Sequence, residues 1–206
     1  MKDFMLGQLF GLTLKNCLIT NYKISFTTNK PLEARKFLDL SNEMLHIKEN
    51  EFIYYLEDIQ YGKDDSAIDK FKLFIPNLLS RQVYFFHRPE KSQPQLTITY
   101  YSEALPKIIL SMLKQLPVLQ RNRDFSKGLI DACISNSDFN NEKSELFIEN
   151  SDLNALLMNS FSNLGIYYEL RTDGLHLINF HDLIDIRSFS DISRGKLHYI
   201  KIPVKE

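Results

Sequence analysis

Glycine is scarce in this chain, and the short motifs that mark many ligand-binding and catalytic sites are missing with it. Seven glycines occur among 206 residues, whereas loops that cradle phosphate need glycine so that the backbone can approach the ligand. The sequence contains no P-loop, GxGxxG, GxSxG, HExxH or EF-hand pattern. These absences argue against the enzyme classes that carry such motifs, although an active site built from distant residues leaves no linear signature.

Cysteine is equally scarce. Cys17 and Cys133 are the only cysteines, and neither belongs to a CxxC pair, which argues against a zinc site or a redox-active dithiol. The apolar run at residues 4–14 is interrupted by Gln8 and lacks a small-residue cleavage site, so we expect no signal peptide. The longest charge-free stretch, residues 153–168, is too short to cross a bilayer. We predict a cytoplasmic protein with no membrane insertion.

A strong net charge of either sign is absent as well. The 25 basic and 26 acidic residues leave a net charge of −1, which does not favour binding to a polyanion. Hydrophobic residues make up 44% of the chain, which is enough for a sizeable core. We predict a single domain spanning residues 1–206, with a two-lobed alternative whose boundary lies in the polar segment 135–144. No internal repeat is evident.

The patterns that are present favour an α+β fold. Apolar and polar residues alternate over residues 22–27, which predicts a strand, and residues 12–20 are its expected hairpin partner. Residues 105–116 carry one continuous apolar stripe at helical spacing, and Asp173-Gly174 predicts a tight hairpin turn. We predict a mixed fold of mainly antiparallel hairpins with about four to five amphipathic helices.

Two further hairpins are predicted from paired apolar runs. Residues 44–47 and 52–56 flank a charged turn, and residues 83–87 and 96–101 flank a loop with two prolines.

The best catalytic candidate is a cluster of imidazoles and carboxylates near the C-terminus: His176, His181, Asp182 and Asp185. Such groups can hold a divalent metal that activates water, or act as an acid–base pair. The spacing is poor support, since His176 is expected on a strand face and Asp182 is expected to cap the following segment. We assign no catalytic residue, metal ligand or cofactor and favour a protein that is not an enzyme. A hydrolase-type enzyme with a site around His176 and His181 is the alternative.

A second alternative is a single-stranded nucleic-acid binder, because aromatic residues gather on two predicted strands where they could stack on bases. They are Tyr84, Phe85 and Phe86, followed by His87 and Arg88, with Tyr100 and Tyr101 on the next strand. The first strand lacks the basic and glycine positions of familiar RNA-recognition strands, and the net charge of −1 supplies no drive from counterion release. Nucleic acid is therefore not an expected partner.

The function that these patterns favour is a protein–protein interaction module. The strand that begins at Phe52 is apolar on both faces, with Phe52 and Tyr54 on one face and Tyr55 on the other. Such a strand must be covered twice, once by its own core and once by something else. Leu110 is an apolar residue outside the stripe of its helix. We predict an adaptor or chaperone-like subunit of a larger, bacterial assembly that binds other proteins through Phe52, Tyr54, Tyr55 and Leu110.

Overall fold

The computed structural model of the chain describes residues 1–58, 67–87, 93–134, 139–140, 145–149, 153–171 and 174–177. Within these ranges it contains seven α-helices and two sheets, so the predicted α+β class is confirmed. The helices are α1 (Lys2–Asn16), α2 (Pro31–Leu45), α3 (Ala67–Lys72), α4 (Ala104–Lys114), α5 (Leu116–Leu119), α6 (Arg123–Cys133) and α7 (Leu153–Leu164). None of these helices is long and apolar enough to cross a membrane.

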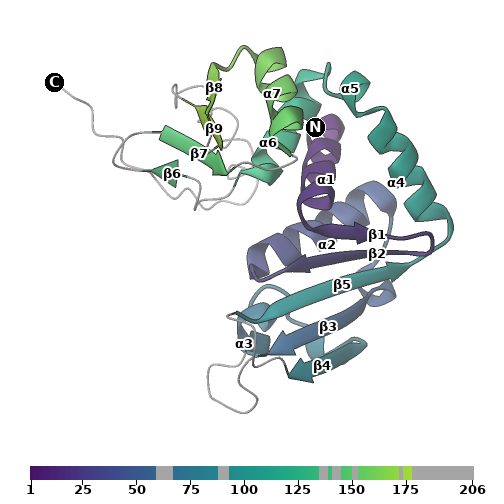
Figure 1. The fold of residues 1–206 in the computed structure, drawn as a ribbon. Coiled ribbons are helices and arrows are strands. Elements are labelled where there is room, and N and C mark those ends of the chain that lie inside the picture. The colour runs from purple at the N-terminus through teal and green to yellow at the C-terminus, as the bar shows by residue number, and fades with distance from the viewer. Residues whose placement is uncertain are drawn as a thin grey trace.

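The strands are β1 (Cys17–Ile19), β2 (Lys23–Thr28), β3 (Ile53–Asp58), β4 (Val83–His87), β5 (Gln95–Tyr101), β6 (Phe139–Asn140), β7 (Glu145–Glu149), β8 (Tyr168–Leu170) and β9 (Gly174–Leu177). The N-terminal sheet has the order β1-β2-β5-β3-β4 and the C-terminal sheet the order β6-β7-β9-β8 (Figure 1). Neighbouring strands are antiparallel except β3 and β4, which are parallel. Two short 3-10 helices, η1 (Glu49–Glu51) and η2 (Leu78–Ser80), flank the segment that holds β3 and α3.

The two sheets repeat one arrangement, which the sequence analysis did not find. In each half a helix precedes a hairpin (α1 before β1 and β2, α6 before β6 and β7), a second helix follows, and the last strand of the set lies between the others. Only β4 has no counterpart among the described strands of the C-terminal sheet. The trace of this repeat in the sequence is short: Asp3-Phe4 followed by Gly7, and Asp124-Phe125 followed by Gly128.

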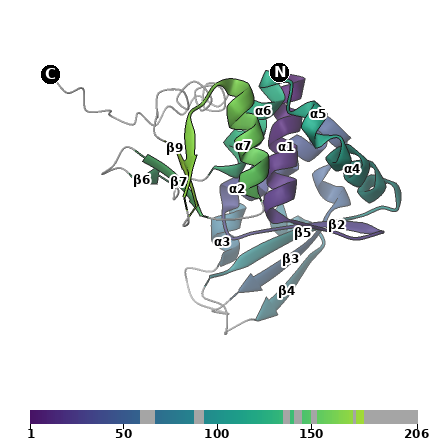
Figure 2. The ribbon, with the colours of Figure 1, turned by 45° about the horizontal axis from the view of Figure 1, so that its top comes forward.

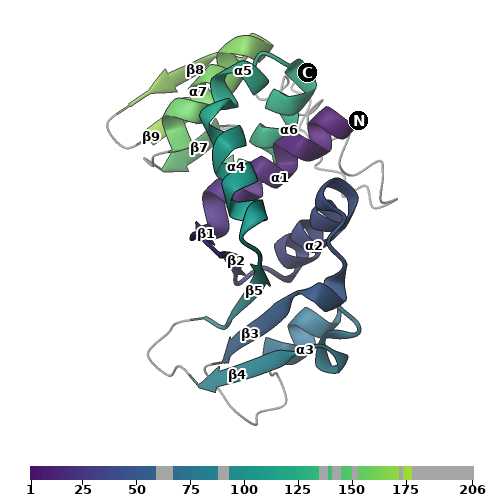
Figure 3. The same ribbon diagram turned by 90° about the vertical axis from the view of Figure 1, so that its right-hand side faces the viewer.

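The described helices lie on one side of the N-terminal sheet (Figures 2 and 3). Phe26, Tyr54 and Ile98 of three adjacent strands point to this inner side and are fully buried. Phe37 of α2 stacks on Phe26 with ring centroids 4.3 Å apart, and Phe71 of α3 belongs to the same cluster. One face of the sheet therefore builds the core, while no described helix covers the other.

The N-terminal helix is the largest difference from the sequence prediction. We predicted a strand over residues 12–20, whereas α1 runs to Asn16 and only Cys17–Ile19 forms a strand. Residues 7–13 are all buried, so the middle of α1 has no polar face. A helix that is buried on all sides shows no amphipathic period, and that period is the signal by which a sequence reveals a helix.

Helices α1 and α6 cross at two glycines, where their backbones are in direct contact. A Cβ atom at Gly7 would lie 2.1 Å from the carbonyl oxygen of Phe125, and one at Gly128 would lie 1.9 Å from that of Phe4. Both distances are far shorter than any van der Waals contact between these atoms, so a residue with a Cβ atom forces the helices apart.

The next turn of the crossing is also tight. A Cβ atom at Gly11 would lie 2.6 Å from the Cβ of Ala132, and the Sγ of Cys133 donates a hydrogen bond to the carbonyl oxygen of Gly11 at 3.9 Å. Burial raises the pKa of this thiol to about 12, so it stays neutral and packs as a small apolar group. Gly7 and Gly128 are separated in sequence by the same number of residues as Gly11 and Ala132. The crossing is therefore built from equivalent positions of the two helices.

Two predicted hairpins are wrong. Residues 44 and 45 end α2 and do not pair with β3, and β4 pairs with β3 in parallel instead of with β5. These strands find partners that are not next to them in sequence, which adjacent apolar runs cannot reveal. The hairpin predicted at Asp173-Gly174 is confirmed, because β8 and β9 are antiparallel with Leu170 opposite Leu175.

The helix predicted over residues 105–116 is confirmed as α4, although it is interrupted at Gln115 and continues as α5. Ile109 and Leu116 of its stripe are buried, and Leu105 and Leu113 are half-buried. The predicted boundary at 135–144 lies outside the described residues apart from β6, and the single-domain organisation stays a prediction.

We expect Gly7→Ala to lower the free energy of unfolding by about 1–3 kcal/mol or more, because the added methyl group collides with the backbone of α6. Helix propensity alone predicts the opposite sign, a gain of up to about 1 kcal/mol. Urea denaturation followed by circular dichroism measures the difference, with Ser111→Ala on the exposed side of α4 as the control. An unchanged or raised midpoint for Gly7→Ala would show that the two helices do not depend on backbone contact.

Candidate functional site

The outer face of the N-terminal sheet is the most distinctive surface of the molecule. Side chains alternate along each strand, so that Ile24 and Phe26 of β2 point to the core and Lys23, Ser25 and Thr27 point outward. We call the outward side the open face. Its side chains are Leu18 of β1, Lys23, Ser25 and Thr27 of β2, Gln95, Thr97, Thr99 and Tyr101 of β5, Ile53, Tyr55 and Glu57 of β3, and Tyr84 and Phe86 of β4.

Hydroxyl groups line the centre of the open face. The hydroxyls of Ser25 and Thr99 lie 3.0 Å apart across β2 and β5, and those of Thr27 and Thr97 lie 2.9 Å apart on the next row. In each pair one hydroxyl donates and the other accepts. Thr27 and Thr97 are half-buried, so their remaining lone pairs can accept from a ligand, whereas Ser25 and Thr99 are 7% and 1% exposed. These cross-strand pairs also fix the side chains, because each one holds the rotamer of its neighbour.

Aromatic rings line the part of the open face that lies toward β4. Tyr55 packs against Tyr84 with ring centroids 5.4 Å apart and planes at 19°, and against Phe86 with centroids 6.1 Å apart. The hydroxyls of Tyr55 and Tyr101 lie 3.3 Å apart, and Gln82 donates to the hydroxyl of Tyr84 at 2.7 Å. We call Tyr55, Tyr84, Phe86 and Tyr101 the aromatic edge.

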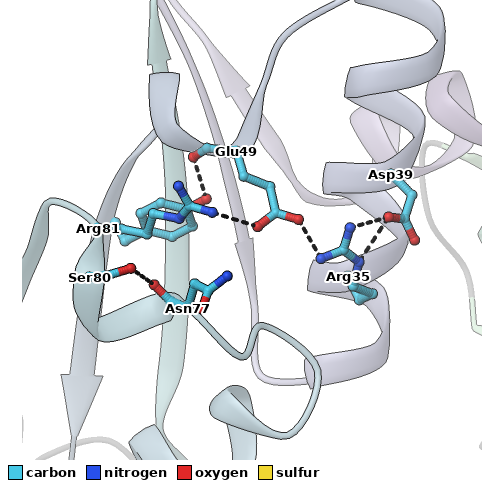
Figure 4. A network of polar contacts seen from close by, with 7 residues as sticks. Arg35, Asp39, Glu49, Asn77, Ser80 and Arg81 are labelled. Atoms are coloured by element: carbon cyan, nitrogen blue, oxygen red, sulfur yellow. Dashed lines mark hydrogen bonds and ion pairs between the residues drawn. The ribbon is translucent and has the colours of Figure 1, made fainter.

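A network of charged groups holds β4 against the rest of the protein (Figure 4). The carboxylate of Glu49 in η1 lies between two guanidinium groups: Arg35 of α2 donates to it, and so does Arg81, just before β4, at 3.4 Å. Arg35 also donates from Nε to Asp39 at 2.8 Å, and this bond to Asp39 raises the pKa of Arg35. The hydroxyl of Tyr54 donates to the carbonyl oxygen of Glu49 at 2.8 Å. The network thus joins α2, η1, β3 and the start of β4.

The open face carries little charge. Lys23 supplies a cation at one end of β2, and Glu57 supplies an anion near Phe86 in β4. Several other lysines are paired elsewhere: Lys36 of α2 lies 2.5 Å from Asp131 of α6, and both Lys15 and Lys30 pair with Glu33. The open face is therefore a polar and aromatic surface with a single lysine on its strands.

The four residues predicted to bind a partner are placed in three different environments. Phe52 and Tyr54 are buried, at 3% and 0% exposure, because they point to the core. Tyr55 points to the open face, as the predicted alternation requires. Leu110 is 43% exposed on α4. The predicted alternation, with Phe52 and Tyr54 on one face and Tyr55 on the other, is therefore confirmed, and the described helices cover only one of the two faces.

The predicted histidine cluster falls largely outside the described residues. His176 lies in β9, opposite Phe147 and Glu169, while His181, Asp182 and Asp185 lie beyond the ranges that the structure describes. Among the described residues, no group of three or more histidine, cysteine, aspartate or glutamate side chains could hold a metal ion.

The predicted stacking platform is divided between the two faces of the sheet. Tyr84, Phe86 and Tyr101 belong to the open face, whereas Phe85 lies opposite Leu56 on the inner side. Tyr100 also points inward, where it packs against Phe52 with ring centroids 5.6 Å apart. The alternation of side chains along each strand could have shown that these aromatic residues lie on two different faces. The position of Tyr55 beside Tyr84 could not be predicted, because it depends on the parallel pairing of β3 and β4.

The fold is similar to that of the homing endonuclease I-DmoI. A structure of mesophilic variants of that endonuclease has a TM-score of 0.52 and 13% sequence identity, and the match covers 91% of this chain and 94% of that chain. The structure of I-DmoI in complex with DNA and Mn has a TM-score of 0.52 at 12% identity, covering 91% of this chain and 96% of that one. The complex with DNA and Ca has a TM-score of 0.52 at 15% identity, covering 91% and 89%.

No protein-family model matches the sequence, and no curated protein sequence matches it significantly. At identities this low the likeness to I-DmoI concerns the fold. The likeness covers 91% of this chain.

This likeness contradicts the prediction of an adaptor or chaperone-like subunit whose partners are other proteins. The similar structures described above are of a homing endonuclease, and two of them were solved with DNA and a metal ion. The expectation that nucleic acid is not a partner is wrong for the same reason. The prediction relied on net charge and on short motifs, and neither of them reports the shape or the chemistry of a sheet face.

We expect Tyr101→Phe to lower the pKa of Tyr55 from about 12 toward the ordinary value of about 10. The hydrogen bond with Tyr101 is the main cause of the raised pKa, because it stabilises the protonated hydroxyl of Tyr55. Spectrophotometric titration of the tyrosines between pH 8 and pH 13 gives the shift, and Tyr167→Phe, at an exposed tyrosine elsewhere, is the control. If the titration curve loses one ordinary tyrosine and is otherwise unchanged, the two hydroxyls are not coupled.

Proposed function

We propose that this protein binds double-stranded DNA through the open face of its N-terminal sheet. The observation that carries the proposal is a sheet face that no described helix covers and on which the half-buried Thr27–Thr97 hydroxyl pair lies beside exposed aromatic rings, in a fold similar to that of an endonuclease solved with DNA. A sheet face that no helix covers commonly marks a binding site, and a ligand of matching size is the simplest occupant of this one.

The chemistry of the face suits the edges of base pairs. Strands can enter the major groove, where each base pair presents its own pattern of donors and acceptors. The hydroxyls of Thr27 and Thr97 can donate to or accept from these base edges, whereas those of Ser25 and Thr99 are buried. The methyl groups of the threonines suit contact with the methyl group of thymine. Lys23 supplies a contact to phosphate at the end of the face.

The electrostatic contribution to binding is modest. The net charge of −1 gives no long-range attraction to DNA. The sequence between residues 187 and 205, which lies outside the described ranges, adds local cations: Arg187, Arg194, Lys196, Lys201 and Lys205 against Asp191. We therefore propose that affinity depends more on hydrogen bonds and packing than on phosphate contacts, and that it falls gently with salt concentration.

DNA cleavage is the second candidate function, because the protein that shares the fold is an endonuclease. The described residues supply a binding surface, and binding is therefore the function that we propose first. Incubation of supercoiled and linear DNA with Mg²⁺ or Mn²⁺ tests cleavage separately from binding.

The two unpaired cysteines fit a reducing compartment, which supports a cytoplasmic location.

We expect Thr27→Val combined with Thr97→Val to weaken binding to a preferred duplex about tenfold and to leave binding to unrelated duplexes unchanged. Valine keeps the shape of threonine but cannot form the hydrogen bonds that distinguish one base pair from another. Selection from a random duplex library supplies the preferred sequence, and fluorescence anisotropy measures the affinities, with Ser111→Ala as the control. If the wild-type protein enriches no sequence and binds no duplex at low salt, the proposed function is wrong.

We also expect Lys23→Ala to weaken binding equally for all duplexes and to reduce the slope of log affinity against log salt concentration by about one. A lysine that contacts phosphate displaces a counterion, whereas one that faces solvent elsewhere does not. Lys107→Ala, at an exposed position on α4, is the matched control. If Lys107→Ala changed the affinity and the salt dependence as much as Lys23→Ala does, Lys23 would not be a residue that contacts the DNA.

A further inference from the structure

Two members of the aromatic edge, Tyr84 and Phe86, belong to β4, which has no counterpart among the described strands of the C-terminal sheet. In the C-terminal sheet, β8 and β9 follow each other in sequence, whereas β3 and β5 are separated in sequence by α3, η2 and β4. The additional strand widens the sheet and brings Tyr84 and Phe86 next to Tyr55. The N-terminal sheet therefore has a group of aromatic residues at its edge that the shared architecture does not require.

These rings are ordered although they are exposed. Tyr84, Phe86 and Tyr101 are 44%, 43% and 47% exposed, whereas Phe26 and Tyr54 on the inner face of the same sheet are fully buried. Phe85, on the inner side of the edge strand β4, is also 44% exposed. Hydrogen bonds hold the phenol groups: Gln82 donates to Tyr84, and Tyr55 pairs with Tyr101. The network around Glu49 holds the strand itself. Rings that are held in place before a ligand arrives lose little entropy when it binds.

The aromatic edge is continuous with the hydroxyl rows of the open face. Thr27, Thr97, Tyr55 and Tyr84 lie opposite one another in register across four adjacent strands. A nucleic acid that contacts the hydroxyls can therefore reach the rings without a break in the surface.

The chemistry of the edge selects a base over the sugar–phosphate backbone. In a duplex the bases are stacked on one another and present only their edges to the grooves, so that an aromatic ring has no base face to contact. An unpaired base does offer its face, and stacking on an aromatic side chain is the usual way in which proteins hold it.

We infer that the aromatic edge stacks on an unpaired base, and that the preferred ligand is a duplex with an unpaired base or a single-stranded extension on the β4 side of the open face. This inference rests on the proposed binding of DNA to the open face. It adds a preference for DNA structure to any preference for base-pair sequence.

The experiment compares a blunt duplex, the same duplex with a three-nucleotide extension at one end or the other, and the extension strand alone. The unpaired position carries 2-aminopurine, whose fluorescence is quenched when it stacks. We expect an extension to strengthen binding to the wild-type protein about tenfold, with quenching on binding. Tyr84→Ala and Phe86→Ala are expected to lose this gain and the quenching, so that the ratio of the affinities for the extended and the blunt duplex falls to about one.

Two control variants separate stacking from other effects. Tyr84→Phe keeps the ring and is expected to keep the gain, and Tyr167→Ala removes an exposed tyrosine far from the edge and is expected to change nothing. Circular dichroism confirms that each variant is folded.

The outcomes distinguish this inference from the proposed function. If the protein binds blunt and extended duplexes equally, and Tyr84→Ala has no effect, the inference is overturned and the binding of duplex DNA stands. If it binds and quenches the single strand but no duplex, the role of the aromatic edge stands and the duplex proposal fails. If no nucleic acid binds in any form, both are overturned.

Discussion

The contact between the backbones of α1 and α6 is the constraint on which the rest of the structure depends. Gly7 and Gly128 allow each helix to touch a carbonyl oxygen of the other, at a distance that no side chain permits. Strand β1 follows α1 directly at Cys17, and the C-terminal sheet follows α6, so the crossing determines where both sheets begin. Figure 1 shows these helices between the two sheets. A change in the distance between the helices would move each sheet relative to the other.

Because the described helices lie on one side of the N-terminal sheet, this sheet has one buried and one open face. The buried face carries aliphatic and aromatic side chains that form a close-packed core, as is usual in proteins. The open face does not, since it combines hydroxyl pairs at 2.9 and 3.0 Å with half-exposed rings. Such a surface is stable in water because its polar groups are paired with one another, and those pairs can exchange for contacts with a ligand.

The net charge describes the chain as a whole, and a motif describes a short segment. Neither can reveal a surface that is assembled from distant strands, and both therefore led to a wrong function. A surface for nucleic acid can be built from neutral hydroxyl and aromatic groups that lie on separate strands. Thr27 and Thr97 are far apart in sequence and meet only through the pairing of β2 and β5. Tyr55 and Tyr84 meet through the parallel pairing of β3 and β4. No local pattern contains either pair.

The sequence by itself determined the features that depend on neighbouring residues: the α+β class, the alternation in β2, the amphipathic α4 and the hairpin at Gly174. It also determined the alternation of side chains between the two faces of β3. Only the tertiary structure decided that α1 is a helix, because its residues 7–13 are buried on all sides and lack an amphipathic period. The pairing of β4 and the composition of the open face were likewise decided by contacts between distant segments, since strands take their partners from the whole chain and not from their neighbours in sequence.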